Sequence, residues 1–238
     1  MKTWVIPDVH GCLLTLQTLV EELILPAEGD NLIFLGDLID RGPASKGVMD
    51  YVMNLQHRLT DVHILRGNHE DYMIKVFDAE KNKSRFKSLL GLKSGVAKEW
   101  TFHGGKDTLK SLGLRSAADI PQHYIDWINT FKYVIEWENF LIVHAGFNFQ
   151  NEDIFSDQRA MMWSRDYEID QEKLGNRKII HGHVPVNLEF IFNSVNSSTF
   201  DFIDLDNGVY LADKPGFGNL PALELNSMHL VVQPNVDF

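Results

Sequence analysis

Three short apolar stretches in the first third of the chain are each followed, within a few residues, by a side chain that can bind a metal ion. The stretches are residues 3–6, 32–35 and 62–65, and the side chains are those of Asp8, Asp37 and Asn68. Apolar residues at helical spacing lie between the stretches, over 13–23 and about 45–56. Continuous apolar strands that alternate with helices are typical of a parallel sheet covered on both faces.

These three side chains are predicted to meet at one edge of that sheet. In open parallel sheets, ligands bind beyond the carboxyl ends of the strands. A single Asp at one such end is usually only a helix cap. Three successive strand ends with metal-ligand side chains instead indicate a binding site.

The rest of the chain predicts further elements around this site. Residues of about 71–130 are polar and helical in pattern, which indicates a helical insert beside the site. Eight short apolar stretches follow, and their close spacing predicts antiparallel hairpins in a second sheet. They are residues 133–137, 140–143, 178–180, 189–192, 200–203, 209–211, 222–225 and 229–232. No linker-like segment interrupts the 238 residues, so we expect 1–238 to be a single domain.

Composition limits the classes of partner. The formal net charge of −11 disfavours a nucleic-acid polymer, because such binding depends on Lys and Arg that neutralise phosphates. No apolar run approaches 18 residues and no basic leader opens the sequence, so we expect a cytoplasmic protein without a membrane partner. The single cysteine, Cys12, excludes an internal disulfide.

Two further segments complete a set of candidate ligands for two metal ions. Asp8 and His10 project to the same side of an extended segment and can reach one ion. Asp37 has two carboxylate oxygens and is the candidate bridge between that ion and a second one. The candidate ligands of the second ion are Asn68, His144 and His183. This mixture of oxygen and nitrogen donors fits manganese first, with iron or zinc as alternatives.

Such a pair of ions suits the hydrolysis of a phosphoester. A hydroxide that bridges the two ions would attack phosphorus in line with the leaving group. His69 is the candidate general acid, and Asp40 is the candidate partner that keeps its imidazole charged. Arg41 and Arg165 could bind phosphate oxygens, although Arg41 could instead form only a loop salt bridge and Arg165 could be an ordinary surface residue.

These segments together resemble the PPP family of metallophosphatases. The family pattern is Gly-Asp-x-His-Gly, Gly-Asp-x-x-Asp-Arg-Gly, Gly-Asn-His-Glu, His-Gly-Gly and a late Gly-His, and the chain matches it from Asp8 to His183. Pro7 and Ala145 depart from it, and neither change removes a ligand. The C-terminal Ser-Ala-Pro-Asn-Tyr-Cys sequence of the eukaryotic members is absent, so the chain looks like the bacterial or phage branch of the calcineurin-like metallophosphoesterases.

The resemblance implies an α/β fold of four layers, α/β/β/α, in which two mixed sheets are flanked by helices. It implies the same metal ligands as above, His69 with Asp40 as the catalytic pair, and Arg41, Arg165 and Asn68 as phosphate-binding residues.

Two enzymes of this branch remain open as the function. The first expectation is a serine/threonine protein phosphatase that acts on a phosphorylated protein or a small phosphoester. The alternative is a hydrolase of diadenosine tetraphosphate or another dinucleoside polyphosphate, for which Trp100, Phe102 or His103 of the insert would have to stack on a base. A scaffold that only binds phosphorylated partners is disfavoured, because it has no need for His69 and Asp40.

Overall fold

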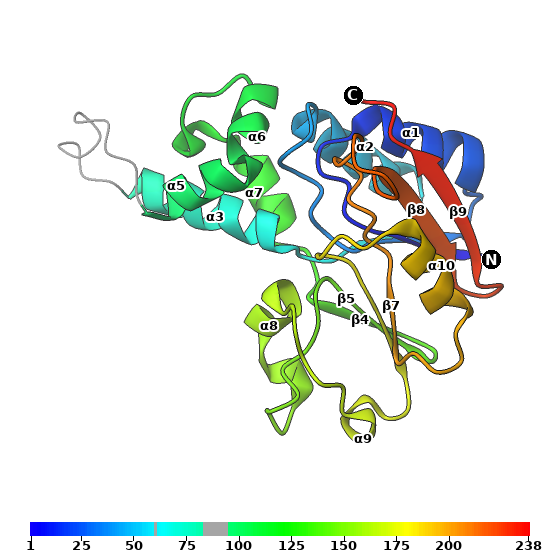
Figure 1. Cartoon of the computed structure of the whole chain (residues 1–238). Coiled ribbons are helices and arrows are strands. Elements are labelled where there is room, and N and C mark those ends of the chain that lie inside the picture. The colour runs from blue at the N-terminus through cyan, green and yellow to red at the C-terminus, as the bar shows by residue number, and fades with distance from the viewer. Residues whose placement is uncertain (60, 83–94) are drawn as a thin grey trace.

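The strands form two mixed sheets that pack face to face, with helices on the outer sides (Figure 1). This computed structural model describes residues 1–59, 61–82 and 95–238. The core between the sheets joins Val5 and Ile33 of the first sheet to Ile142 and Ile180 of the second. The predicted four-layer α/β fold is therefore confirmed.

The first sheet has the strand order β3-β2-β1-β8-β9. Its strands are β1 (Thr3–Ile6), β2 (Asn31–Phe34), β3 (Asp61–Ile64), β8 (Asn219–Glu224) and β9 (His229–Pro234). The first three are parallel, as predicted, and β8 pairs antiparallel with β1 through Trp4 and Glu224. Every residue of β1 and β2 is buried, which explains why their sequences are apolar without alternation.

The second sheet has the strand order β4-β5-β6-β7. Its strands are β4 (Val134–Trp137), β5 (Phe140–Val143), β6 (Lys178–His181) and β7 (Phe202–Asp204). Only β4 and β5 form a hairpin, whereas β5, β6 and β7 are parallel.

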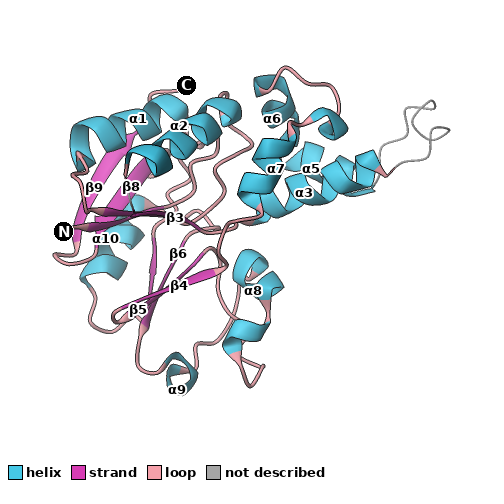
Figure 2. Cartoon of the chain, turned by 180° about the vertical axis from the view of Figure 1, so that it is seen from behind, coloured by secondary structure: helices cyan, strands magenta, loops and turns pink. Residues whose placement is uncertain are grey.

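Helices cover both outer faces (Figures 1 and 2). Those on the first sheet are α1 (Leu13–Thr18), the π-helix η1 (Leu19–Ile24) and α2 (Ser45–Arg58). The second sheet carries η4 (Ile154–Ser156), α8 (Gln158–Trp163) and α9 (Gln171–Leu174) on its outer face. Helix α10 (Leu188–Asn196) instead packs through Ile191 and Val195 against the core between the sheets. No helix in the part of the chain that the structure describes is long and apolar enough to cross a membrane.

The predicted insert is helical where it is described, and residues 83–94 of it lie outside the described residues. Its elements form a lobe beside the sheets (Figure 1). They are α3 (Asn68–Lys81), α5 (Gly95–Trp100), η2 (Thr101–Gly105), α6 (Lys106–Ser111), η3 (Ala117–Asp119) and α7 (Gln122–Ile128).

Two predicted strands are not strands, one predicted hairpin lies in the other sheet, and β5, β6 and β7 are parallel where antiparallel hairpins were predicted. Residues 189–192 lie in helix α10, because the Asn187 side chain accepts a hydrogen bond from the Phe190 amide (2.8 Å) and caps the helix. Residues 209–211 form a turn, which the Leu211 amide closes by donating to the Gly208 carbonyl. The predicted hairpin of residues 222–225 and 229–232 exists as β8 and β9, but it belongs to the first sheet rather than the second.

Candidate metal centre

The candidate ligands gather where the two sheets present the carboxyl ends of their parallel strands. Asp8 and His10 follow β1, Asp37 follows β2, and Asn68 and His69 begin helix α3 directly after β3. From the other sheet, His144 follows β5 and His183 follows β6. All seven side chains that the sequence predicted as ligands or acid are therefore brought to one place, and all but His183 are almost fully buried.

One cluster of donor atoms surrounds Asn68. Its Oδ1 lies 3.2 Å from Nε2 of His144 and 3.0 Å from Nδ1 of His183. Oδ2 of Asp37 lies 3.6 Å from the same His144 nitrogen. Two imidazoles, an amide oxygen and a carboxylate form a donor set that zinc, manganese or iron binds. Asp37, His144 and His183 can thus hold one metal ion.

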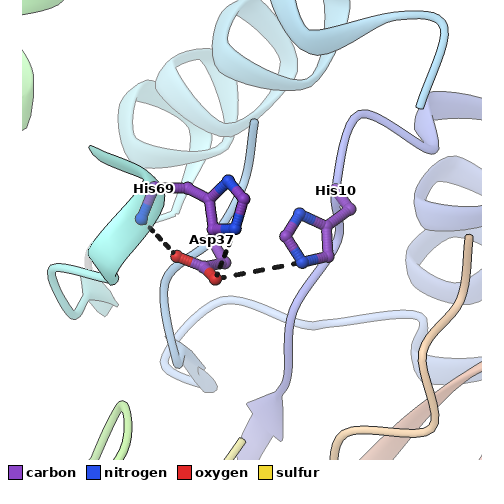
Figure 3. Close-up of side chains that lie close together, drawn as sticks. All are labelled: His10, Asp37 and His69. Atoms are coloured by element: carbon purple, nitrogen blue, oxygen red, sulfur yellow. Dashed lines mark hydrogen bonds and ion pairs between the residues drawn. The ribbon is translucent and has the colours of Figure 1, made fainter. Parts of the chain in front are cut away.

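A second cluster shares the same Asp37 oxygen and includes His10 and His69 (Figure 3). Oδ2 of Asp37 lies 3.9 Å from Nε2 of His10 and 3.8 Å from Nε2 of His69. Oδ2 of Asp8 lies 4.0 Å from the same His10 nitrogen. By distance, His10, Asp37 and His69 can also hold an ion. The structure therefore places His69, which the sequence predicted as an acid, among potential ligands.

Backbone carbonyls fix the orientation of two of these imidazoles. Nδ1 of His10 faces the Ile39 carbonyl and Nδ1 of His144 faces the Leu35 carbonyl, each at 2.9 Å. Because a carbonyl only accepts, each ring carries its proton on Nδ1 and presents an unprotonated Nε2. Burial lowers the pKa of both histidines, which favours the neutral imidazole that a metal requires.

His69 and Asp40 form a hydrogen-bonded pair on the side of the site that faces the helical insert. Nδ1 of His69 lies 2.7 Å from Oδ2 of Asp40. The same Asp40 oxygen accepts a hydrogen bond from Nε1 of Trp100 (2.8 Å), and Asp40 Oδ1 accepts one from the Thr108 hydroxyl. Burial lowers the pKa of His69, but the carboxylates of Asp37 and Asp40 outweigh it, and the net shift is upward.

Arg41 lies against the same imidazole. Its Nη2 is 3.3 Å from Nε2 of His69, and its guanidinium carbon lies 4.3 Å from the ring centre of Tyr210. The stacked Tyr210 ring holds the guanidinium beside the site. No ion pair joins Arg41 to Asp40 among the described residues, so the alternative of a simple loop salt bridge is not what this structure contains.

Arg165 approaches from the second sheet. It is exposed on the loop after α8 and lines a cavity beside His183. Burial first, then His144, lower the pKa of His183 to about 3, and the positive charge of Arg165 contributes to that shift. The guanidinium charge of Arg165 therefore acts on the cluster of candidate ligands that contains His183.

The site is built on backbone that L-residues seldom adopt. Five of its residues have positive φ: His10 (46°), Asp37 (48°), Asp40 (71°), Arg41 (68°) and His183 (76°). Each such residue costs about 1 kcal/mol or more, and residues of this kind concentrate at functional sites. Hydrogen bonds compensate locally, since the amides of Asp37 and Leu38 donate to the buried Glu70 carboxylate at 2.9 and 2.8 Å.

Several residues of the site make contacts that the sequence did not indicate. Glu70 belongs to a recognised segment, but its role in holding the turn at Asp37 depends on a contact 33 positions away. Trp100, considered as a base-stacking residue, is instead buried against Asp40. His103, which the sequence offered as a base-stacking candidate, has its ring centre 6.5 Å from that of His69 and 5.8 Å from that of Tyr72.

Sequence relatives with assigned names match only part of the chain. The symmetrical bis(5'-nucleosyl)-tetraphosphatase of Pectobacterium atrosepticum is 36% identical over 93 residues, which is 38% of this chain and 32% of that protein. The protein of the same name from Klebsiella pneumoniae is 39% identical over 93 residues, which is again 38% of this chain and 32% of that protein. The matched region therefore spans about a third of the length of these relatives.

Solved structures match the fold over the whole chain. A provisionally assigned diadenosine tetraphosphatase superposes with a TM-score of 0.60 at 16% identity, covering 100% of this chain and 95% of its own. A serine/threonine phosphatase of Saccharomyces cerevisiae superposes with a TM-score of 0.61 at 16% identity, covering 100% and 81%. At this identity, the two structures show that the fold is shared.

The family itself follows from a match that includes the candidate ligands. The model of the calcineurin-like phosphoesterases matches residues 1–211, a range that contains both metal-ligand clusters, His69 and both arginines. The resemblance inferred from the sequence is confirmed, and this chain belongs to the calcineurin-like phosphoesterase family.

Proposed function

We propose that this chain hydrolyses a phosphoanhydride bond of a dinucleoside polyphosphate. The observation that carries the proposal is an aromatic surface beside His69. His103 lies next to His69 and is stacked on Tyr72 at an interplanar angle of 17°, and the neighbouring Phe102 is 86% exposed. Aromatic rings of this kind can stack on a nucleobase. The names of the partial sequence relatives favour the same substrate class over a phosphoprotein.

The metal-binding roles follow from charge as well as distance. We assign Asp8, His10 and Asp37 to one ion and Asp37, Asn68, His144 and His183 to the other. Arg41 lies 3.3 Å from Nε2 of His69 and would repel a cation at that nitrogen, so His69 is left out of the first set although its distance fits. When bound, the two ions supply an activated water and neutralise charge on the phosphate. We expect manganese, with iron and zinc as alternatives.

His69 is the proposed general acid, and its surroundings suit that role. The Asp40 carboxylate accepts from Nδ1 and holds the ring, while Trp100 and Thr108 hold Asp40. Nε2 is not engaged by Asp40, and the Arg41 guanidinium 3.3 Å from it can hold a phosphate whose leaving oxygen reaches this nitrogen. Because the pKa of His69 is raised, the imidazolium form persists toward neutral pH.

Arg41, Arg165 and the Asn68 amide are the proposed phosphate-binding groups. Arg41 reaches the site from the side of His69, and Arg165 reaches it from the side of His183. Two guanidinium groups beside the metal-ligand clusters suit a chain of several phosphates. The protein as a whole is acidic, so these local charges and the metal ions would have to attract the substrate.

A direct comparison of substrates tests the proposal. In one assay supplemented with Mn²⁺, kcat/KM is measured on diadenosine tetraphosphate and on a phosphoserine peptide. We expect the dinucleotide to be preferred by at least about tenfold, because only it can use the aromatic surface. Preference for the phosphopeptide would overturn the proposal in favour of a serine/threonine protein phosphatase.

The leaving group gives a second readout in the same assay. A nucleoside diphosphate is a far better leaving group than a serine alkoxide and depends less on protonation. His69→Asn should therefore reduce kcat less on diadenosine tetraphosphate than on the phosphopeptide. An equal loss on both substrates would mean that His69 does not protonate the leaving oxygen.

A further inference from the structure

A large cavity opens on the outer side of the second sheet, next to the metal-ligand clusters. Its volume is about 1190 Å³, which exceeds the roughly 300–1,000 Å³ typical of small-molecule sites. Ala145 and Gly182, the chain neighbours of His144 and His183, form part of its lining, as does Arg165. The cavity is therefore continuous with the side of the site at which Arg165 lies.

Aromatic rings line this cavity in two pairs. The rings of Phe149 and Tyr167 lie 5.8 Å apart at 32°, and those of Phe190 and Phe202 lie 6.2 Å apart at 30°. Tyr167 is held in place, since its hydroxyl donates to the Ala145 carbonyl (3.2 Å). Flat apolar walls of this kind fit a planar ring better than an aliphatic chain.

Two hydrogen-bond acceptors lie among these rings. His181 of β6 and Asp204 of β7 are register partners, and both line the cavity. Oδ1 of Asp204 accepts from the Asp206 amide (3.0 Å), and within the described ranges nothing donates to its Oδ2. Nδ1 of His181 lies 3.1 Å from the Gly182 carbonyl, so the ring carries its proton there and Nε2 is an acceptor.

Charge decides which part of a substrate can enter. Asp166, Glu168 and Asp170 line the cavity, whereas burial raises the pKa of the 4%-exposed Asp204 and disfavours its charged form. Carboxylates repel phosphate, so the phosphates must stay near Arg165 and the metal ions. A neutral ring that carries an amino group can enter, and its N–H can donate to an oxygen of Asp204.

We infer that this cavity binds one nucleobase of the substrate, with the exocyclic amine of the base donating to Asp204 and the ring lying between the two aromatic pairs. The inference rests on the proposed function and adds a second base site, separate from the aromatic surface at His103. It makes Asp204 a specificity-determining residue for bases with an amino group. Uracil presents a carbonyl at the corresponding edge and would be disfavoured.

Three variants of the full chain test this site. Asp204→Asn replaces an acceptor by a donor in the cavity and can still accept from the Asp206 amide. Gln150 lies on an exposed loop and lines the cavity, so Gln150→Trp places a large ring in it. Glu152 is exposed on the same loop but is not a lining residue, so Glu152→Trp is the control. For each, KM is measured on diadenosine and diuridine tetraphosphate, with p-nitrophenyl phosphate as a substrate too small to need the cavity, and ADP binding is measured calorimetrically.

We expect Asp204→Asn to raise KM for diadenosine tetraphosphate about tenfold and to leave or lower that for diuridine tetraphosphate, because the pairing at the amine edge is inverted. Gln150→Trp should weaken both dinucleotides and ADP by about tenfold or more, while Glu152→Trp behaves as the wild type. Rates on p-nitrophenyl phosphate should not change.

The outcomes separate the inference from the proposed function. Unchanged dinucleotide KM and ADP affinity in Asp204→Asn and Gln150→Trp would overturn the base site, even if the wild type hydrolyses diadenosine tetraphosphate. A different outcome is that both variants bind ADP more weakly but the wild type does not hydrolyse dinucleotides. That result would support the base site and reject the proposed substrate. Failure of the wild type to bind ADP would overturn the base site as well.

Discussion

Nδ1 of His69 lies 2.7 Å from Oδ2 of Asp40, and both side chains are almost completely buried. A buried imidazole and carboxylate at this distance stabilise each other as an ion pair, since few water molecules can screen them. The pair lies between the metal-ligand clusters and the helical lobe, and residues from the lobe complete it. This arrangement links the chemistry of the site to a part of the chain outside the two sheets.

Removal of the Asp40 charge is expected to change the pH profile. The pKa of His69 is raised, so its imidazolium form and the activity that depends on it persist to higher pH. In Asp40→Asn, the pKa of His69 falls, and the alkaline limb of kcat/KM should move to lower pH. Asp50→Asn on helix α2 serves as the control, because Asp50 pairs with Lys46 and lies outside the site. An unshifted alkaline limb would show that His69 is not the titrating group.

The hydrogen bond from Trp100 to Asp40 is expected to stabilise the fold. Trp100→Phe removes its Nε1 donor to a buried carboxylate, which should lower the free energy of unfolding by about 2 kcal/mol. The matched control is Trp137→Phe, because Nε1 of Trp137 is buried and has no partner in the described chain. Urea denaturation measures both variants, and the control should lose much less stability. Equal losses would assign the effect to ring packing rather than to the hydrogen bond.

Close packing at Gly67 is expected to position Asp37. A Cβ at Gly67 would overlap Oδ1 of Asp37, whereas a Cβ at Gly95 would meet none of the described atoms within 4 Å. Gly67→Ala should therefore displace the bridging carboxylate and reduce kcat about a hundredfold. Gly95→Ala in helix α5 should keep full activity, with stability unchanged or raised by less than about 1 kcal/mol. Manganese affinity and kcat measured for both variants check this, and a fully active Gly67→Ala would contradict the assigned position of Asp37.

The strand ends that carry the ligands could be predicted from the sequence because their signal is local. Asp8, Asp37 and Asn68 each follow an apolar stretch within three residues, and parallel strands align their carboxyl ends at one edge. The same logic placed His144 and His183 after β5 and β6. Residue type and position were sufficient to predict that these candidate ligands lie together, without knowledge of the distances.

Other features depend on contacts that sequence patterns do not encode. The apolar run Phe190-Ile191-Phe192 fits a strand as well as a helix, and Asn187 decides the outcome by capping α10. The assignment of the β8–β9 hairpin depends on its pairing with Trp4 and Val5, more than 200 residues away along the chain. The bond from Trp100 to Asp40 spans 60 residues. Nothing in the sequence near any of these residues specifies such partners.

Electron paramagnetic resonance of the manganese-loaded protein tests most directly whether Asp37 bridges two metal ions. Two Mn²⁺ ions that share one carboxylate are expected to be magnetically coupled. The wild type should bind two ions and give the spectrum of a coupled pair. Asp37→Asn should lose the coupling and bind at least about tenfold more weakly, because the shared charge is removed. A single bound ion in the wild type, or two ions without coupling, would contradict the account.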